Sequence, residues 1–411
     1  MIPTYSTRER DRRWSLAHRL MEEEGVDALI VYAERENGFP GSFLPDNYFT
    51  NERPGNIVLF PKNAEPILFV FPTTVIEDHI QAAYTGHKSW IRPENMYVGK
   101  MGSKVVEIIE ERGLEHSAFG VVGLEGYPPY HMDGPMPYNT FQTLTEDLPN
   151  ATFKPVGSRL WELTAVKSDE ELEVLKWSAS VGESMCQSML EAAAPGVREN
   201  EIYAAAMRAC AEHVGFTTYM LLGSGAEFAG WGPPVWTYRP EEPRTIEAGD
   251  VIVGEVFASF GMLETQHQPS IAVGKVHADF ERAAEMARKS YECGVQALRA
   301  GSTFGDVVAA MKAPTRELDC WQVHPLVHSI NPFGLIGVGD KMADLPEASR
   351  YGSVTKIPSI GLETVLEAGM VFAVEPNCAI GRRLVNLGGT VVVGATGGIE
   401  LNQNTTRLMR A

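Results

Sequence analysis

The segment Leu366–Pro376, with the sequence LEAGMVFAVEP, constrains the fold of this chain more than any other stretch. Its Gly-Met pair is typical of a turn, and the apolar run that follows is typical of a buried strand. Glu375 stands at the end of this run, so the segment combines a turn, a strand and a carboxylate at fixed spacing. Glu375 is therefore a candidate functional residue. The alternative is a carboxylate without a role in an inward-facing turn.

Composition excludes several classes of protein. The chain has 411 residues, which predicts two or three domains at about 150 residues each. Its formal net charge of −18 argues against a nucleic-acid partner, because the phosphate backbone attracts patches of Lys and Arg. No apolar run approaches the roughly 18 residues that span a bilayer, and the first residues lack the apolar core of a signal peptide. We therefore expect neither a nucleic-acid partner nor a membrane partner.

The cysteines indicate a reducing compartment. Five cysteines are spread along the chain without a CxxC pair. An odd number at wide spacing is typical of reduced thiols and not of a disulfide framework or a zinc site. We therefore expect a cytoplasmic protein.

The pattern of helices and strands divides the chain into two domains. Residues 1–158 alternate helical and strand patterns, as a small α/β domain does. A capping-box signature at Ser6–Glu9 opens the first helix. Beyond it we expect strands over 27–32, 56–60, 66–71 and 119–124, and helices over 74–83 and 103–112.

Residues 159–411 show helices first and strands later, which favours an α+β domain with a mostly antiparallel sheet. A second capping box, Ser168–Glu171, opens a long helix that ends before Pro195. The remaining expected elements are helices over 199–214 and 280–299, and strands within 246–273, over 371–375 and over 390–393.

Several motifs of the second domain occur in the order found in a known family. Trp161–Glu171, Pro195–Glu199, Gly223–Gly225 and Ala248–Val253 precede the segment Leu366–Pro376. Together these motifs resemble the pita-bread domain of creatinase, prolidase and aminopeptidase P. The resemblance implies a pita-bread fold for residues 159–411 and the family's smaller amino-terminal domain for residues 1–158.

The resemblance also implies where metal ligands would stand. Metallopeptidases of the family bind two metal ions with two Asp, one His and two Glu. The matching residues in this chain are Glu255, Gln266, His328, Glu375 and Gly388. Gln266 is a neutral amide and Gly388 has no side chain, so only two carboxylates remain, too few for a pair of divalent ions. We therefore expect no metal ion and no other cofactor.

Without a metal, the expected chemistry is proton transfer. In the resembled family, creatinase hydrolyses a C–N bond without metal, using a His as acid and base and glutamates that hold a guanidinium group. Glu375 matches one of these glutamates and His267 falls on the position of the other, whereas the loop that carries the creatinase His has none here. The candidates for proton transfer are therefore His328 and His267. The alternatives are a core histidine at 328 and an exposed strand histidine at 267.

Glu255 and one loop complete the expected site. Glu255 should share a strand face with Val253 and Phe257, where an unpaired carboxylate is costly, so we expect it to be paired within the site. The loop after Gly230 brings aromatic rings and an Arg together, groups that can hold a cationic or planar substrate. The expected substrate contacts are Gln266, Trp231, Trp236, Tyr238 and Arg239. The alternative for the loop is a rigid surface segment.

These residues favour a metal-independent hydrolase that cleaves a C–N bond, other than a peptide bond, in a small polar metabolite. Three alternatives stay open. They are a lyase that performs β-elimination on the same fold, a hydrolase or aminopeptidase with one metal ion at Glu255, His328 and Glu375, and a binding protein without catalysis. The expected partner is a small-molecule substrate, and the family resemblance also implies a homodimer.

Overall fold

The computed structural model describes residues 1–33, 44–71, 73–126, 133–342, 344–351 and 358–411. These residues form two compact units, one within 5–164 and the other made of 1–4 and 165–411. The division falls after helix α6 (Gly157–Thr164), which contacts helix α1 (Thr7–Glu24) of the first unit. The first unit therefore ends after α6, somewhat later than the boundary expected at residue 158.

The first unit is built on a six-stranded sheet in the order β4-β3-β2-β1-β5-β6. The sheet is mixed, because β1 pairs antiparallel with β2 on one side and parallel with β5 on the other. Its strands are β1 (Ala28–Tyr32), β2 (Ile57–Pro61), β3 (Ile67–Val70), β4 (Met96–Val98), β5 (Ala118–Val122) and β6 (Thr152–Pro155). Its remaining helices are α2 (Pro45–Thr50), α3 (Thr74–Tyr84), α4 (Gly102–Glu111) and α5 (Tyr138–Asp147), with a short 3₁₀ turn η1 (Pro93–Asn95).

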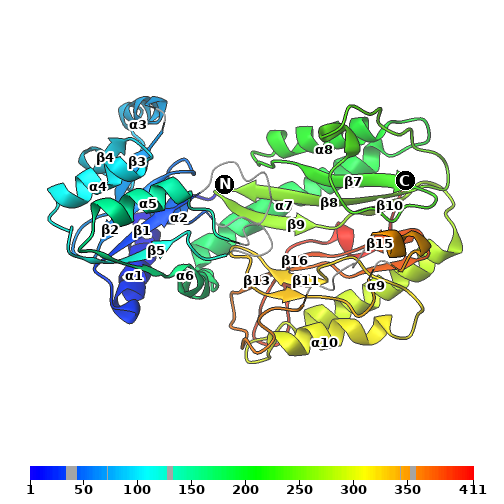
Figure 1. The fold of residues 1–411 in the computed structure, drawn as a ribbon. Helices are drawn as coiled ribbons and strands as arrows, with labels where there is room; N and C mark the ends of the chain where they lie inside the picture. Colours follow the sequence, from blue (N-terminus) through cyan, green and yellow to red (C-terminus); the bar gives the residue numbers. More distant parts are fainter. Residues whose placement is uncertain (34–43, 72, 127–132, 343, 352–357) are drawn as a thin grey trace. The chain divides into compact units, whose positions relative to one another are not determined.

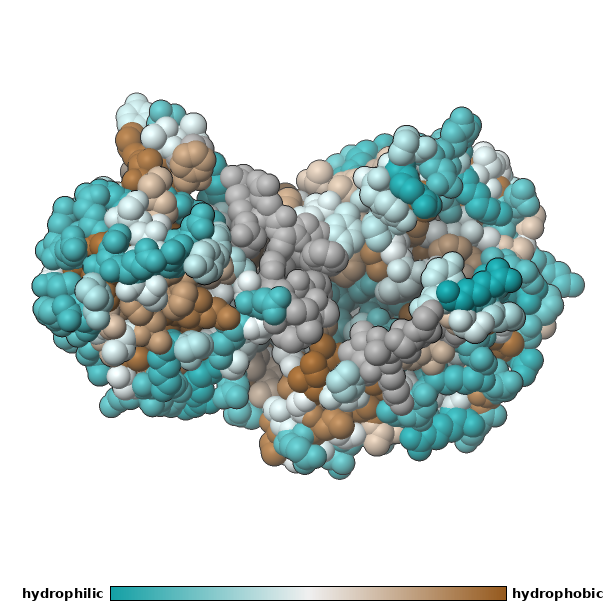
Figure 2. Space-filling model, viewed as in Figure 1, coloured by the Kyte–Doolittle hydropathy of each residue, from teal (hydrophilic) through white to brown (hydrophobic). Residues whose placement is uncertain are grey.

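One buried cluster of the first unit lies between this sheet and the helices α4 and α5. Ile30 of β1 and Phe69 of β3 belong to one buried cluster with Ile109 of α4 and Leu144 of α5. The strands and helices expected in residues 1–158 are all present within a few residues of their expected bounds. Helix α3 carries exposed apolar side chains, and apolar atoms gather over it in Figure 2.

The second unit is built on a ten-stranded sheet. Eight strands follow the order β12-β11-β13-β16-β9-β8-β10-β18, while β7 pairs with β8 and β17 pairs with β16. Its strands are β7 (Met220–Gly225), β8 (Val251–Phe260), β9 (Leu263–His267), β10 (Ser270–Ala272), β11 (Val327–Ser329), β12 (Ile336–Gly337), β13 (Val371–Val374), β16 (Gly389–Val392), β17 (Ile399–Glu400) and β18 (Met409–Arg410). Among the described strands of this sheet, only β10 and β18 pair in parallel, so the expectation of a mostly antiparallel sheet is confirmed.

Helices cover the sheet of the second unit in two pairs, and a separate hairpin lies beside the second pair (Figure 1). The helices are α7 (Asp169–Ala192), α8 (Glu199–Glu212), α9 (Ala278–Ala297) and α10 (Phe304–Thr315), and the hairpin joins β14 (Asn377–Ile380) to β15 (Arg383–Asn386). Short 3₁₀ turns occur at η2 (Val235–Thr237), η3 (Pro346–Arg350) and η4 (Asn404–Thr406).

Strand β8 shows which side chains face each helix pair. Ile252 and Val256 belong to the buried cluster of α7 and α8, whereas Val251 and Val253 belong to the cluster of α9 and the hairpin. Successive side chains of a strand face opposite sides. Glu255 therefore shares the face of Val251 and Val253, as its position in the sequence predicts.

A local signal in the sequence explains where helix α7 begins. At the start of α7, Ser168 Oγ accepts the Glu171 N–H at 3.1 Å and Glu171 Oε2 accepts the Ser168 N–H at 2.9 Å, so the expected capping box is formed. The sequence pattern did not predict several elements, among them α10, β7, β11 and the β14–β15 hairpin. Strand β11 has three residues and lies between Pro325 and Pro332, a length at which no periodicity can show.

Two further expectations concern the whole chain. All five cysteines are free thiols. Among the helices in the described ranges, none combines the length and the apolar character that crossing a membrane requires.

Candidate functional site

Four of the expected site residues meet at the centre of the ten-stranded sheet. Glu255 belongs to β8, Gln266 to β9 and His328 to β11, and Glu375 directly follows β13. Each of these four residues is at most 5% exposed. The four residues come from sequence positions far apart and form one buried polar cluster.

The register of the strands explains this meeting. Val256 pairs with His267, so Glu255 lies opposite Gln268, one residue beyond β9. His328 pairs with Ala373, two residues before Glu375, and the Glu375 N–H donates to the Leu326 carbonyl at 2.9 Å. Side chains at directly opposite or diagonal positions on one face of a sheet are close enough to interact.

His328 sits at the middle of the cluster. Its Nδ1 lies 2.9 Å from the Ser329 carbonyl oxygen, an acceptor, so Nδ1 carries a hydrogen. Its Nε2 lies 3.2 Å from Glu375 Oε1 and 3.1 Å from Gln266 Oε1. A proton on either His328 or Glu375 makes the contact between these two groups a hydrogen bond. The Gln266 oxygen can only accept, so it bonds Nε2 when the ring carries a hydrogen there. The Phe333 ring stacks on the imidazole at 4.1 Å and fixes its plane.

Gln268 joins the two carboxyl groups. Its Nε2 donates to Glu255 Oε1 at 3.1 Å and to Glu375 Oε2 at 2.8 Å. Its Oε1 accepts from Asn386 Nδ2 at 2.8 Å, so every polar atom of the Gln268 amide has a partner. Glu255 and Glu375 are also hydrogen-bond partners of each other. Gln268 was not among the residues expected from the sequence.

Glu264 is the second residue that sequence analysis missed. Gln266 Nε2 donates to Glu264 Oε1 at 3.0 Å, which turns the Gln266 carbonyl oxygen toward His328. Residues 264, 266 and 268 are two positions apart along one extended segment, so their side chains share a face. The pattern Glu264-x-Gln266-x-Gln268 was the signal that could have found both residues once Gln266 was a candidate.

Burial acts in opposite directions on the acids and on the imidazole. Burial, reinforced by the negative charge of Glu375, raises the pKa of Glu255 well above its ordinary value, and burial also raises the pKa of Glu375. Burial lowers the pKa of His328, against the opposing influence of the Ser329 carbonyl and of nearby carboxylates. Burial therefore favours the uncharged form of each group, a protonated carboxyl group and a neutral imidazole.

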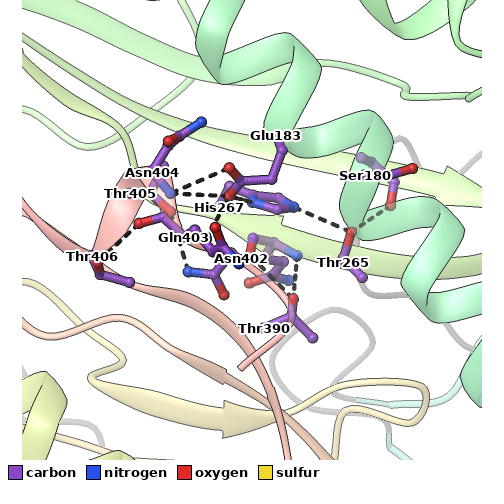
Figure 3. A network of polar contacts seen from close by, with 12 residues as sticks. Ser180, Glu183, Thr265, His267, Thr390, Asn402, Gln403, Asn404, Thr405 and Thr406 are labelled. Carbon is purple, nitrogen blue, oxygen red and sulfur yellow. Dashed lines mark hydrogen bonds and ion pairs between the residues drawn. The ribbon is translucent and has the colours of Figure 1, made fainter. Parts of the chain in front are cut away.

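His267 does not join this cluster, contrary to expectation. It follows Gln266 directly in β9, so its side chain faces the opposite side of the sheet, toward α7. There its Nδ1 lies 3.7 Å from Glu183 Oε1 and its Nε2 lies 3.4 Å from Thr265 Oγ1 (Figure 3). The alternative of an exposed histidine is also wrong, because His267 is 0% exposed.

The loop side chains do not form one aromatic wall. Trp231 packs against the buried cluster of α9 and the hairpin, whereas Trp236 packs against the cluster of α7 and α8. The centroids of the Trp236 and Tyr203 rings lie 6.4 Å apart. Tyr238 is 62% exposed, and Arg239 lies 3.3 Å from Glu241 at the surface. Trp231 therefore lies on the side of β8 that Glu255 faces, and Trp236 lies on the other side.

Two of the five positions at which the family resemblance places metal ligands carry an amide, Gln266, and a glycine, Gly388. A Cβ atom at Gly388 would lie 1.9 Å from the Val374 carbonyl oxygen, so no ligand side chain has room there. Gln266 is neutral and already bonded to Glu264, and the Gln268 amide lies between Glu255 and Glu375. No group of three or more His, Cys, Asp or Glu in the described part of the chain is arranged to hold a metal ion.

Comparisons with known proteins agree with the fold and the motifs. The sequence model of metallopeptidase family M24 matches residues 173–401. The chain is 23% identical over 292 residues to a Xaa-Pro dipeptidase from Pyrococcus furiosus, across 68% of this chain and 74% of the relative. It is 20% identical over 392 residues to a creatinase from a Bacillus species, across 91% of this chain and 84% of the relative.

The fold of this chain also matches the folds of solved structures. An X-Pro aminopeptidase from Thermotoga maritima superposes with a TM-score of 0.72 at 16% identity, across 97% of this chain and 99% of that chain. The expected two-domain fold is therefore confirmed, with a smaller amino-terminal α/β domain followed by a pita-bread domain.

Proposed function

The chain belongs to metallopeptidase family M24, and on this premise we propose that it is a hydrolase. The proposed bond is a C–N bond, other than a peptide bond, in a small polar metabolite. The proposed chemistry is proton transfer by His328, Glu375 and Glu255 without a metal ion. One observation carries the proposal: an imidazole with a lowered pKa contacts a carboxyl group with a raised pKa.

Opposite pKa shifts in contact assign an acid and a base. At neutral pH the imidazole is free to take a proton and the carboxyl group holds one to give. We assign His328 Nε2 as the base, since Nδ1 is bound to the Ser329 carbonyl. We assign the acid to Glu375, which faces Nε2, with Glu255 as its hydrogen-bonded partner.

His328 and Glu375 can together carry out every proton transfer that hydrolysis requires. The oxygen of a water molecule bonds to the carbon, the C–N bond breaks, and His328 takes the proton that the water loses. Glu375 gives its proton to the departing nitrogen. The proton on His328 then returns to Glu375 across their 3.2 Å contact, which restores the starting state. Acid–base catalysis of this kind contributes about 10²–10⁴ in rate.

The departure from the metallopeptidase ligand set supports the metal-free form of the proposal. Gly388 leaves no room for a fifth ligand, and Gln266 carries no charge. The alternative with one metal ion at Glu255, His328 and Glu375 is disfavoured because the Gln268 amide already bonds both carboxyl groups. Creatinase is among the relatives, and its name denotes a substrate other than a peptide.

The first experiment is a turnover screen with protein purified in a chelator. The panel holds guanidino, amidine and cyclic amide metabolites together with Xaa-Pro dipeptides. We expect turnover of a guanidino, amidine or cyclic amide metabolite. The rate of this turnover should be the same with and without the chelator. His328→Ala and Glu375→Gln should each lower kcat at least 100-fold, because each removes one end of the proton cycle.

His213→Ala serves as the matched control, because His213 is an exposed histidine at the end of α8. It should keep the activity of the unchanged protein. Turnover that disappears in the chelator and returns with a divalent ion would contradict the metal-free proposal. Full activity in both His328→Ala and Glu375→Gln would contradict the assignment of the acid and the base.

A further inference from the structure

The Gln268 amide has a place in the site that no acid–base role explains. Two carboxyl groups that face each other in a buried site repel when charged, and proteins usually join such groups through a cation or a shared proton. Here Glu255 and Glu375 are also joined through one nitrogen atom, at 3.1 Å and 2.8 Å. A primary amide nitrogen has two hydrogens to donate, and Gln268 gives one to each carboxyl group.

We propose that Gln268 is a positioning residue that takes the place of a cation, holding Glu255 and Glu375 together and keeping metal ions out of the site. The inference rests on the proposed metal-free function only in that both concern the same carboxyl pair.

The surroundings fix the orientation of the Gln268 amide. Asn386 Nδ2 donates to Gln268 Oε1, so the nitrogen must point toward the two carboxyl groups. Asn386 is in turn held by Ser270, whose Oγ accepts from the Asn386 N–H at 3.0 Å and donates to its carbonyl at 2.7 Å. Gln268, Asn386 and Ser270 are all at most 1% exposed. The amide is therefore a built part of the site that water does not reach.

This orientation excludes a metal ion at the same place. A divalent ion binds carboxylate oxygens at about 2.0–2.6 Å and needs their lone pairs. An amide N–H that points at the same oxygens competes for these lone pairs, and its hydrogens would face the ion. The side chain at position 268 therefore decides whether Glu255, His328 and Glu375 can act as ligands.

Metal binding tests the proposal without any substrate. The unchanged protein, Gln268→Ala and Gln322→Ala are purified in a chelator, transferred to chelator-free buffer and titrated with Mn²⁺ and with Zn²⁺ by calorimetry. Gln322 is another buried glutamine, outside the cluster, and provides the control. We expect one ion per chain in Gln268→Ala, bound at least tenfold more tightly than by the unchanged protein or by Gln322→Ala.

A stoichiometric ion in the unchanged protein would overturn the proposal. So would a Gln268→Ala variant that binds ions no more tightly than the unchanged protein. Because these measurements use no substrate, a failed turnover screen leaves them intact, and the two proposals fail separately.

A second pair of variants tests the cation role in the presence of the chelator. Gln268→Lys puts an ammonium group with three donors near the two carboxyl groups, whereas Gln268→Met keeps the chain length and removes every donor. We expect Gln268→Met to unfold several degrees below Gln268→Lys in thermal denaturation. Equal unfolding temperatures of these two variants would show that the donors do not hold the carboxyl pair, and would overturn the proposal even if Gln268→Ala did not fold.

Discussion

At the scale of single residues, Gly388 decides the shape of the site. Its φ of +114° is a conformation that other residues rarely adopt, and a Cβ atom would lie 1.9 Å from the Val374 carbonyl oxygen, next to Glu375. We expect Gly388→Ala to lose more than about 3 kcal/mol of unfolding free energy, since backbone must move on both strands. Chemical denaturation measures this loss.

Gly274→Ala is the matched control for Gly388→Ala. Gly274 also has a positive φ, of +67°, but no atom lies within 4 Å of its added Cβ. Its substitution should cost only about 1–2 kcal/mol, from the backbone conformation alone. Equal losses of unfolding free energy in the two variants would mean that the close approach to Val374 does not contribute to the cost of Gly388→Ala.

The sequence predicted some site residues and not others for a physical reason. Glu375, Glu255 and Gln266 were candidates because they stand where the family has carboxylates, and Glu255 also because a carboxylate on an apolar strand face is costly unless it is paired. Gln268 was missed because an amide is an ordinary residue until its partners are known. Its role depends on Glu255, Glu375 and Asn386, which reach it only in the folded sheet.

At the scale of elements, strand alternation separates residues that are neighbours in the sequence. Gln266 and His267 were both expected in the site, although adjacent residues of a strand face opposite sides. The structure places Gln266 with His328 and places His267 against α7. This outcome was available from the sequence, whereas β11 was not, because a three-residue strand shows no periodicity.

The contact of β9 with α7 depends on a glycine. An added Cβ at Gly182 would lie 2.1 Å from His267 Nε2, and the His267 ring is fully buried. Gly→Ala inside a helix usually stabilises by about 1 kcal/mol. We expect Gly182→Ala to lose about 2 kcal/mol instead, because the ring has no free space to enter. Chemical denaturation gives the value.

Two further variants check this contact. Gly294→Ala in α9 meets the flexible Met311 side chain at 2.8 Å and should cost less than Gly182→Ala. In the double variant Gly182→Ala with His267→Ala, the loss should be smaller than the sum of the two single losses, because the clash is gone. A Gly182→Ala variant as stable as the unchanged protein would contradict the packing of His267 on α7.

At the scale of the whole molecule, the two units have separate hydrophobic cores. The core of the first unit draws on β1–β5 and on α4 and α5, whereas the cores of the second unit draw on α7–α10 and the large sheet. The two-domain organisation was predictable, because the pattern of elements changes near residue 160. The homodimer and the cytoplasmic location stay predictions.

Separate cores allow one unit to depend on pH without the other, and Asp46 gives the first unit such a dependence. Asp46 is 0% exposed, and burial raises its pKa from 3.8 to about 6, against the N–H bonds of Asn56 and Gly55 and the charge of Lys100. In the unfolded chain Asp46 loses its proton near pH 4, whereas in the folded unit it keeps the proton until about pH 6. At Asp46 the folded state binds more protons over this range. The contribution of Asp46 to stability therefore falls as pH rises from about 4 to about 6 and is constant above.

Asp46→Asn removes this titration and keeps an oxygen for the two backbone N–H groups. The unfolding free energy of the first unit, relative to that of Asp46→Asn, should therefore fall by about 3 kcal/mol between pH 4 and pH 7. Hydrogen exchange of the β1 and β2 amides measures it, while amides of β8 and β9 should show no such difference, since they belong to the other core. Asp147→Asn, at an exposed position of α5, is the control. It should change the unfolding free energy by less than about 0.5 kcal/mol. A difference between the unchanged protein and Asp46→Asn that does not vary with pH would contradict the prediction, because it would mean that Asp46 has the same pKa in the folded and the unfolded chain.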